Sequence, residues 1–142
     1  MFERNVILFV ETFIAFVIAV TLHESAHAAA AAALGDSSPA AAGRLSLAPR
    51  RQMAAIGTIV AIVYSFGICP AGMGWGRPMD VDARRLRVGP NFGLILVALA
   101  GPLINLAIGI GIVLALPLIP GYDQLAPAIV GKCRDALPGE AL

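Results

Sequence analysis

Long apolar segments alternate with short polar ones along the chain, and this pattern predicts its elements. The first apolar segment, about Arg4 to Leu34, predicts one helix of about 30 residues, roughly 45 Å long at 1.5 Å per residue. The last, about Phe92 to Ile119, carries no charged residue over about 28 positions. Each is long enough to cross a hydrocarbon core of about 30 Å, so we expect two membrane-spanning helices.

The apolar segment between them, Met53 to Met73, is weaker as a span. Glycines and prolines interrupt its second half, so only about Met53 to Phe66 suits a helix. Both flanking loops are basic, and the positive-inside rule places basic loops in the cytoplasm; the arginines are Arg44, Arg50, Arg51, Arg77, Arg84, Arg85 and Arg87. A full span cannot leave both loops on one side, so we expect a re-entrant hairpin or a short helix.

Two polar segments have the character of extended chain. Gly43 to Pro49 alternates polar and apolar residues with the period of a strand, although an ordinary surface hairpin explains this pattern better. Trp75 to Val81 contains Pro78, which disfavours helix before it. The sequence therefore predicts an all-α membrane protein with about three apolar segments, two of them spanning, and short β-strands between them. The tail from Pro120 to Leu142 reads as loop or frayed helix.

Composition narrows the class of protein. The chain has 142 residues, 58% of them hydrophobic and only 13% charged, with a mean hydropathy of +0.84. A soluble domain of this size cannot hide so much apolar surface, so we expect an integral membrane protein that contacts the lipid bilayer. A net charge of +1 gives no argument for a nucleic-acid partner. Two cysteines, far apart, predict neither a disulfide framework nor a C-x-x-C metal site.

The candidate chemistry lies in the first apolar segment, at His23-Glu24-Ser25-Ala26-His27. Histidines four apart project from one helix face and can bind a single ion such as Zn²⁺. Glu24 is close enough to take a proton from an attacking water and pass it to the leaving amine, as a general acid/base. The alternative is a pair of buried histidines satisfied by carbonyl groups. Ionisable groups at membrane depth favour the metal site. A cleaved signal peptide is not expected, since it would remove this motif.

Asn105 is a polar amide in the last apolar segment, three residues after Pro102. It can form an interhelical hydrogen bond, or it can donate to a substrate peptide or a developing oxyanion. The sequence favours neither interpretation.

These motifs together resemble the site-2 protease family of intramembrane zinc metalloproteases, most closely its compact prokaryotic branch. The resemblance covers about residues 6 to 115 and rests on His23 to His27, Leu34-Gly35-Asp36, Gly43 to Pro49, Gly57-Thr58-Ile59, Gly74 to Pro78 and Ala100 to Leu106. It implies that His23 and His27 bind Zn²⁺, that Glu24 is the catalytic carboxylate, and that Asn105 lies near the site and contacts substrate.

The resemblance also implies a substrate and a place. The substrate would be a membrane-spanning or membrane-proximal protein, whose unwound chain could pair with the extended segments by strand addition. The protein would lie in the inner membrane of a prokaryotic cell, with its active site toward the cytoplasm.

One part of the family pattern is missing. The family's third zinc ligand is an aspartate in an L-D-G motif on a later helix, and this sequence contains no such motif. The remaining candidates are Asp80, Asp82, Asp123, Asp135, Glu140, Cys69 and Cys133. We therefore expect residues 1–142 to form a single, incomplete intramembrane metalloprotease domain. The alternative is a non-catalytic relative that binds transmembrane segments.

Overall fold

The computed structural model describes residues 2–67 and 74–122. Within them the chain is helical: α1 (Phe2–Leu34), α2 (Ser38–Ala41), α3 (Pro49–Gln52), α4 (Ala55–Gly67), the 3-10 turn η1 (Ala83–Arg85), α5 (Pro90–Ala115) and the 3-10 turn η2 (Leu116–Leu118). Both long helices agree closely with the predicted spans, and the prediction of an all-α chain is confirmed.

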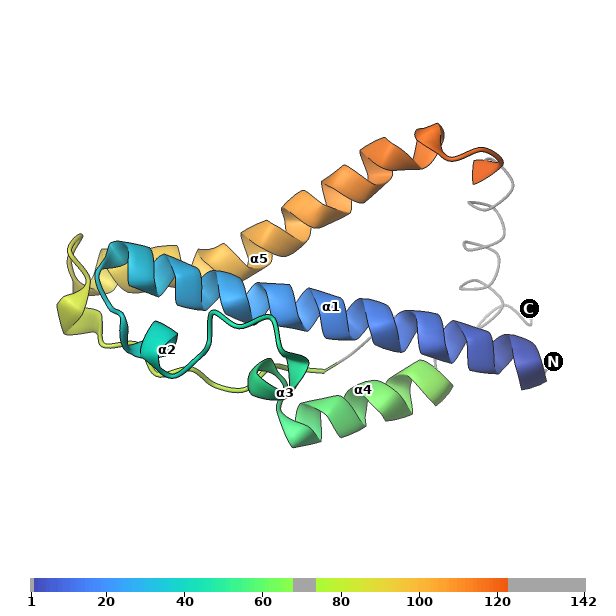
Figure 1. Cartoon of the computed structure of the whole chain (residues 1–142), viewed down its shortest axis with the longest axis horizontal. Helices are drawn as coiled ribbons and strands as arrows, with labels where there is room; N and C mark the ends of the chain where they lie inside the picture. Colours follow the sequence, from blue (N-terminus) through green and yellow to red (C-terminus); the bar gives the residue numbers. More distant parts are fainter. Residues whose placement is uncertain (1, 68–73, 123–142) are drawn as a thin grey trace, which may run out of the picture.

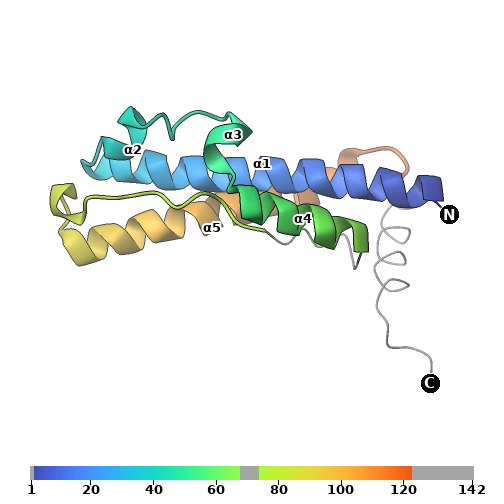
Figure 2. The same cartoon turned by 90° about the horizontal axis from the view of Figure 1, so that it is seen from below.

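Helix α1 is the central element, and the others pack along it (Figure 1). Helix α5 runs antiparallel to α1, with its first residues beside the C-terminal end of α1 (Figure 1). Helix α4 packs against the N-terminal half of α1, and α2 and α3 lie against another side of it (Figure 2). The extended segment after α4 passes between α1 and α5 in this view.

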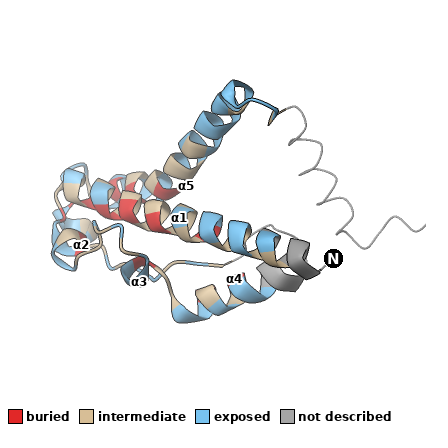
Figure 3. Cartoon of the chain, turned by 45° about the vertical axis from the view of Figure 1, so that its right-hand side comes forward, coloured by how far each residue is buried: buried red, intermediate tan, exposed pale blue. Residues whose placement is uncertain are grey.

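Small residues let α1 and α5 approach closely. The α5 residues Gly93, Val97 and Gly101 are buried and four apart, so they form one stripe along the helix. On α1, Ala28 and Ala31 are fully buried. The buried residues of both helices gather where the two meet (Figure 3).

Beyond this contact α5 changes direction near its middle and diverges from α1 (Figure 1). Pro102, inside α5, lacks the N–H that would bond to the preceding turn and so explains the kink. The diverging half exposes large apolar side chains, among them Leu103, Leu106, Ile110, Val113 and Leu114. By length and composition, Phe9–Leu34 and Pro90–Leu118 are the two helices in the described part of the chain that could cross a membrane.

Helix α4, with 13 residues, is about 20 Å long, too short for a hydrocarbon core of about 30 Å. This confirms the prediction of a short helix rather than a third full span. The returning half of the predicted hairpin falls on residues 68–73, which lie outside the described residues.

The short β-strands predicted between the helices are absent from residues 2–67 and 74–122. Gly43 to Ser46 forms turns, because Gly43 adopts φ +75° and the backbone bonds locally, from Arg44 N to Pro39 O and from Ser46 N to Gly43 O. Helix α3 then begins at Pro49, which suits a first helical position.

The second predicted strand, Trp75 to Val81, is extended but has almost no partner. Its pairing within the described chain is a single antiparallel bridge between Met53 and Gly76. Pro78 has no N–H to donate, and its carbonyl oxygen accepts from the Arg44 side chain instead of from another backbone. The segment is therefore an extended strap, held by backbone contacts at Gly76 and Arg77 and by the Arg44 side chain at Pro78.

Candidate metal centre

His23 and His27 lie one turn apart on the same face of α1, with ring centroids 4.6 Å apart and the rings nearly perpendicular. Both rings point toward Gly101 of α5. A Cβ added to Gly101 would lie 2.6 Å from His23 Nε2 and closer still to His27 Nε2. The two Nε2 atoms therefore converge on one point that the glycine leaves open. Coordination by imidazole requires about 2.0–2.1 Å from nitrogen to zinc, so this space fits an ion held by both histidines.

The other nitrogen of each ring is also contacted. His27 Nδ1 lies 2.6 Å from the Val97 carbonyl oxygen. A carbonyl can only accept, so Nδ1 carries the proton and Nε2 is left with its lone pair free for a metal. Contacts of this kind fix the orientation of metal-binding histidines in proteins.

Asn105 makes the matching contact to His23, with Nδ2 lying 3.3 Å from His23 Nδ1. The Asn105 Oδ1 atom is buried and has no hydrogen-bond partner among the described residues. A rotation of the amide by 180° would place Oδ1 at Nδ1–H of His23 and give both histidines the same tautomer. Asn105 is thus placed to orient His23 from the facing helix.

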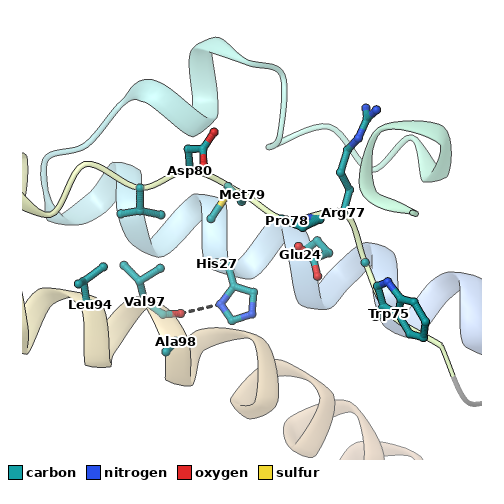
Figure 4. Close-up of a pocket in the computed structure, with 12 residues that line it drawn as sticks. Glu24, His27, Trp75, Arg77, Pro78, Met79, Asp80, Leu94, Val97 and Ala98 are labelled. Carbon is teal, nitrogen blue, oxygen red and sulfur yellow. Dashed lines mark hydrogen bonds between the residues drawn. The ribbon is translucent and has the colours of Figure 1, made fainter. Parts of the chain in front are cut away.

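Glu24 points into a pocket of about 530 Å³ between α1, the strap and α5 (Figure 4). His27 lines the same pocket, together with Gly76 from the strap and Val97 from α5. The Glu24 carboxylate packs directly on the main chain of Gly76, where a Cβ would overlap Oε1. The Glu24 carboxylate and the His27 imidazole, the candidate proton acceptor and a candidate metal ligand, therefore line one cavity.

The strap is held in place by Gln52, which is fully buried. Its Nε2 donates to the carbonyl oxygens of Arg44 (2.6 Å) and Ser46 (2.8 Å) and lies 3.3 Å from Ser25 Oγ on α1. The backbone carbonyl oxygen of Gln52 accepts from Arg77 N at 2.7 Å. Gln52 thus ties the strap to the turn of α1 that follows Glu24.

The structure brings together His23, Glu24, His27 and Asn105. Asp80 also lines the pocket, whereas Asp82 bonds to Arg84 N and pairs with Arg85. No group of three His, Cys, Asp or Glu residues that could hold a metal occurs in the part of the chain described. Of the other predicted third ligands, Asp123, Asp135, Glu140 and the two cysteines lie outside the described residues.

Sequence reasoning missed Gly76, Gly101 and Gln52 as parts of this site. Gly101 stands in the Gly-Pro pair of α5, which signals a kink but says nothing of the facing histidines. Gln52 follows two arginines in a polar segment, where an exposed side chain is the usual expectation. Only the packing of distant segments reveals these roles.

Comparison with known proteins gives one similarity. The chain is 39% identical over 93 residues to "Putative zinc metalloprotease YwhC" of Bacillus subtilis (strain 168), which covers 66% of this chain and 39% of that protein. No protein-family model and no solved structure matches the chain. The matched part thus spans about 39% of the length of the curated relative. The similarity supports a metalloprotease family.

Proposed function

We propose that this chain carries the H-E-x-x-H core of an intramembrane zinc endopeptidase of the site-2 protease type. The observation that carries the proposal is the convergence of His23 Nε2 and His27 Nε2 beside Gly101, with Glu24 in the adjoining pocket. The similarity to a protein named as a zinc metalloprotease supports Zn²⁺ as the cofactor. Candidate spans on both helices of the site support a position in the membrane.

Each residue of the site then has a distinct role. His23 and His27 hold the ion, and the Val97 carbonyl and Asn105 orient their rings. Zinc, when bound, supplies a Lewis acid that polarises the peptide carbonyl and activates water. Glu24 accepts the proton of the attacking water at its carboxylate and returns it to the amine that leaves. The main chain of Gly76 fixes the position of that carboxylate.

Asn105 has an observed partner in His23, which favours the interhelical role. Its role as a donor to substrate stays a prediction. The two roles are compatible if the amide plays them one after the other. The amide orients the ring in the resting site, and the same amide is within the region that a bound peptide would reach.

The substrate we propose is a membrane-spanning or membrane-proximal protein, unwound against the strap from Trp75 to Val81 by strand addition. Because the strap is already extended, pairing with it would need little rearrangement. The basic loops lie at the end of α1 that carries the motif, which supports an active site toward the cytoplasm of a prokaryotic inner membrane.

A second candidate function is a non-catalytic protein that binds transmembrane segments. It is favoured by an apolar groove between α1 and α5, lined by Leu22, Ser25, Ala26, Ala29, Leu45, Ala100, Leu103, Ile104 and Ala107. It is also favoured by the lack of a third ligand among the residues described. Catalytic zinc normally has three protein ligands.

Zinc content separates the two functions. The chain is purified in detergent beside a Glu24→Gln variant and a His23→Ala/His27→Ala variant. We expect about one zinc per chain in the wild type and in Glu24→Gln, and loss in the histidine variant. Absence of zinc from the wild-type chain after incubation with the metal would overturn the enzyme proposal for this chain and leave the binding protein.

A further inference from the structure

Four arginines gather on the outer side of the strap and α3. Arg44 donates from Nη1 to the Arg51 carbonyl oxygen at 2.7 Å and from Nη2 to the Pro78 carbonyl oxygen at 2.6 Å. Arg77, next to Pro78, donates its N–H to the carbonyl oxygen of Gln52, next to Arg51. These contacts bring Arg44, Arg51 and Arg77 together, and Arg50 precedes Arg51 in α3. We call these four residues the basic cluster.

Arg44 is close enough to Glu24 for their charges to interact. In residues 2–67 and 74–122 the ion pair found is Arg85 with Asp82, so no acidic side chain forms an ion pair with Arg50, Arg51 or Arg77 there. Arg50, Arg51 and Arg77 are exposed. The Arg77 side chain extends from the strap away from Glu24 and out of the pocket (Figure 4). Like charges held together repel one another, so an anion from outside the chain would stabilise the arrangement.

The position of the basic cluster along α1 indicates the source of that anion. Gln52, adjacent to Arg51, contacts Ser25, which lies nine residues before the end of α1, about 14 Å along the axis. Ser25 is inside the candidate span Phe9–Leu34. Helix α1, with 33 residues, is about 50 Å long and exceeds a hydrocarbon core of about 30 Å. With the excess length at its C-terminal end, Ser25 and the arginines beside it lie at the level of the lipid headgroups.

Apolar side chains beside the basic cluster support the same source. Leu45, Leu47 and Trp75 are 47%, 61% and 51% exposed. Exposed leucine and tryptophan next to arginine are typical of a surface in the membrane interface, where the rings and aliphatic chains enter the acyl region and the cations meet phosphate. A soluble acidic partner would leave these apolar side chains in water.

We propose that the basic cluster binds the headgroup phosphate of anionic phospholipids such as phosphatidylglycerol. Arginine binds phosphate in bidentate geometry, and each cation near an anionic surface adds to the attraction. Since Arg44 and Arg77 also hold the strap, lipid bound here fixes the wall of the candidate active site at the level of the headgroups. The inference does not depend on zinc or catalysis.

Trp75 is the single tryptophan of the chain and adjoins the cluster, so its fluorescence reports lipid bound there. The protein in a neutral detergent is titrated with phosphatidylglycerol brominated near the carbonyl end of its acyl chains, and separately with phosphatidylcholine brominated at the same place. We expect the wild type to be quenched at a roughly 10- to 30-fold lower mole fraction of the anionic lipid. Equal quenching by both lipids would overturn the proposal.

The matched variants both remove two charges. Arg50→Gln/Arg51→Gln should lose the preference for phosphatidylglycerol, whereas Arg84→Gln/Arg87→Gln, which alters exposed arginines near η1, should keep it. Loss of the preference for phosphatidylglycerol in both variants would mean that net charge alone determines lipid binding. That result would contradict a specific site. Helicity by circular dichroism establishes that each variant is folded, and the single variants Arg50→Gln and Arg51→Gln replace the double one if it is not.

Two further arms identify the ligand. Millimolar inorganic phosphate should leave the quenching by phosphatidylglycerol unchanged. Release of the lipid by phosphate would assign the cluster to a free anion, and release by an acidic peptide at equal charge would assign it to a protein partner. Either result would overturn the lipid proposal.

Discussion

Gly101 lies opposite His23 and His27, where an added Cβ would overlap their Nε2 atoms. Gly76 lies in the same relation to the Glu24 carboxylate. In a helix, glycine is about 1 kcal/mol less favourable than alanine, so Gly101 lowers the intrinsic stability of α5. At the residue scale, the candidate site therefore depends on two glycines, Gly76 and Gly101, because any larger residue at either position would overlap a site side chain.

The variant Gly101→Ala tests this point. We expect it to weaken zinc binding at least about 100-fold, because the methyl group enters the space between the two nitrogens, while helix propensity rises slightly. Gly109→Ala, on the same helix with nothing near its Cβ, is the matched control and should bind zinc like the wild type. Zinc affinity measured by competition with a chelator gives the answer, and an unchanged affinity in Gly101→Ala would mean that the ion is bound elsewhere.

Asn105 permits a second prediction at this scale. If it accepts a hydrogen bond from His23, Asn105→Asp should retain zinc binding, because a carboxylate accepts more strongly, and Asn105→Ala should lower the affinity about 10- to 100-fold. The same chelator competition measures both variants. Equal loss in the two variants would show that the amide acts on His23 as a donor through Nδ2 and not as an acceptor.

At the scale of elements, α1 is joined to its neighbours by a few buried polar groups. The Asp36 carboxylate is fully buried just after α1 and accepts from Ser38 Oγ (2.6 Å), Ser38 N (3.0 Å) and Asp82 N (2.8 Å). It therefore connects α1 to α2 and to the segment before η1. The Ser38 hydroxyl, followed by the Ser38 N–H, holds the pKa of Asp36 below its ordinary value.

This lowered pKa predicts a pH dependence of stability. A carboxyl group whose pKa is lower in the folded state stabilises the fold above its unfolded pKa, about 3.9, and the contribution is lost as pH falls through the folded pKa. Asp36→Asn should therefore melt below the wild type at pH 7, and the difference should shrink as pH falls below about 4. Asp80→Asn, at an exposed position, is the control for general charge effects. A melting difference that does not depend on pH would contradict the prediction.

The elements that sequence predicted well are those whose pattern is local. The spans beginning near Arg4 and Phe92 follow from apolar length alone, and the H-E-x-x-H spacing places both histidines on one helix face. The strand predicted among the possibilities for Gly43 to Pro49 was wrong. Its alternation of polar and apolar residues is also compatible with turns, which form here because Gly43 adopts a positive φ and the Gln52 side chain is buried. That choice depends on contacts with α1, which no local pattern contains.

At the scale of the whole molecule, α1 and α5 are antiparallel, and the described segments with α2, α3 and η1 lie along the half of α1 that ends at Leu34 (Figure 1). The N-terminal end of α1 and the C-terminal end of α5 are at the other end (Figure 1). With the arginine-rich loops in the cytoplasm, these two ends lie on the opposite side of the membrane.

This topology is tested by cysteine labelling after Cys69 and Cys133 are replaced by serine. Arg84→Cys should react with a membrane-impermeant maleimide in inverted membrane vesicles and not in intact spheroplasts. Pro120→Cys, just after η2, should show the reverse. Labelling of both positions from the same side would contradict two antiparallel spans.

The two cavities beside the α1–α5 contact have a consequence for how reactants would be supplied. A hydrolase in a bilayer needs water and an apolar chain at the same point, although the two do not mix. The pocket with Glu24 also contains the charged residues Arg77 and Asp80, whereas the groove with Leu22, Ala26 and Leu103 is apolar and opens from a different face of α1. For the proposed enzyme, water can arrive by one route while the substrate diffuses sideways in the plane of the membrane toward the other. Its encounter rate would then follow the surface density of the substrate and not its bulk concentration.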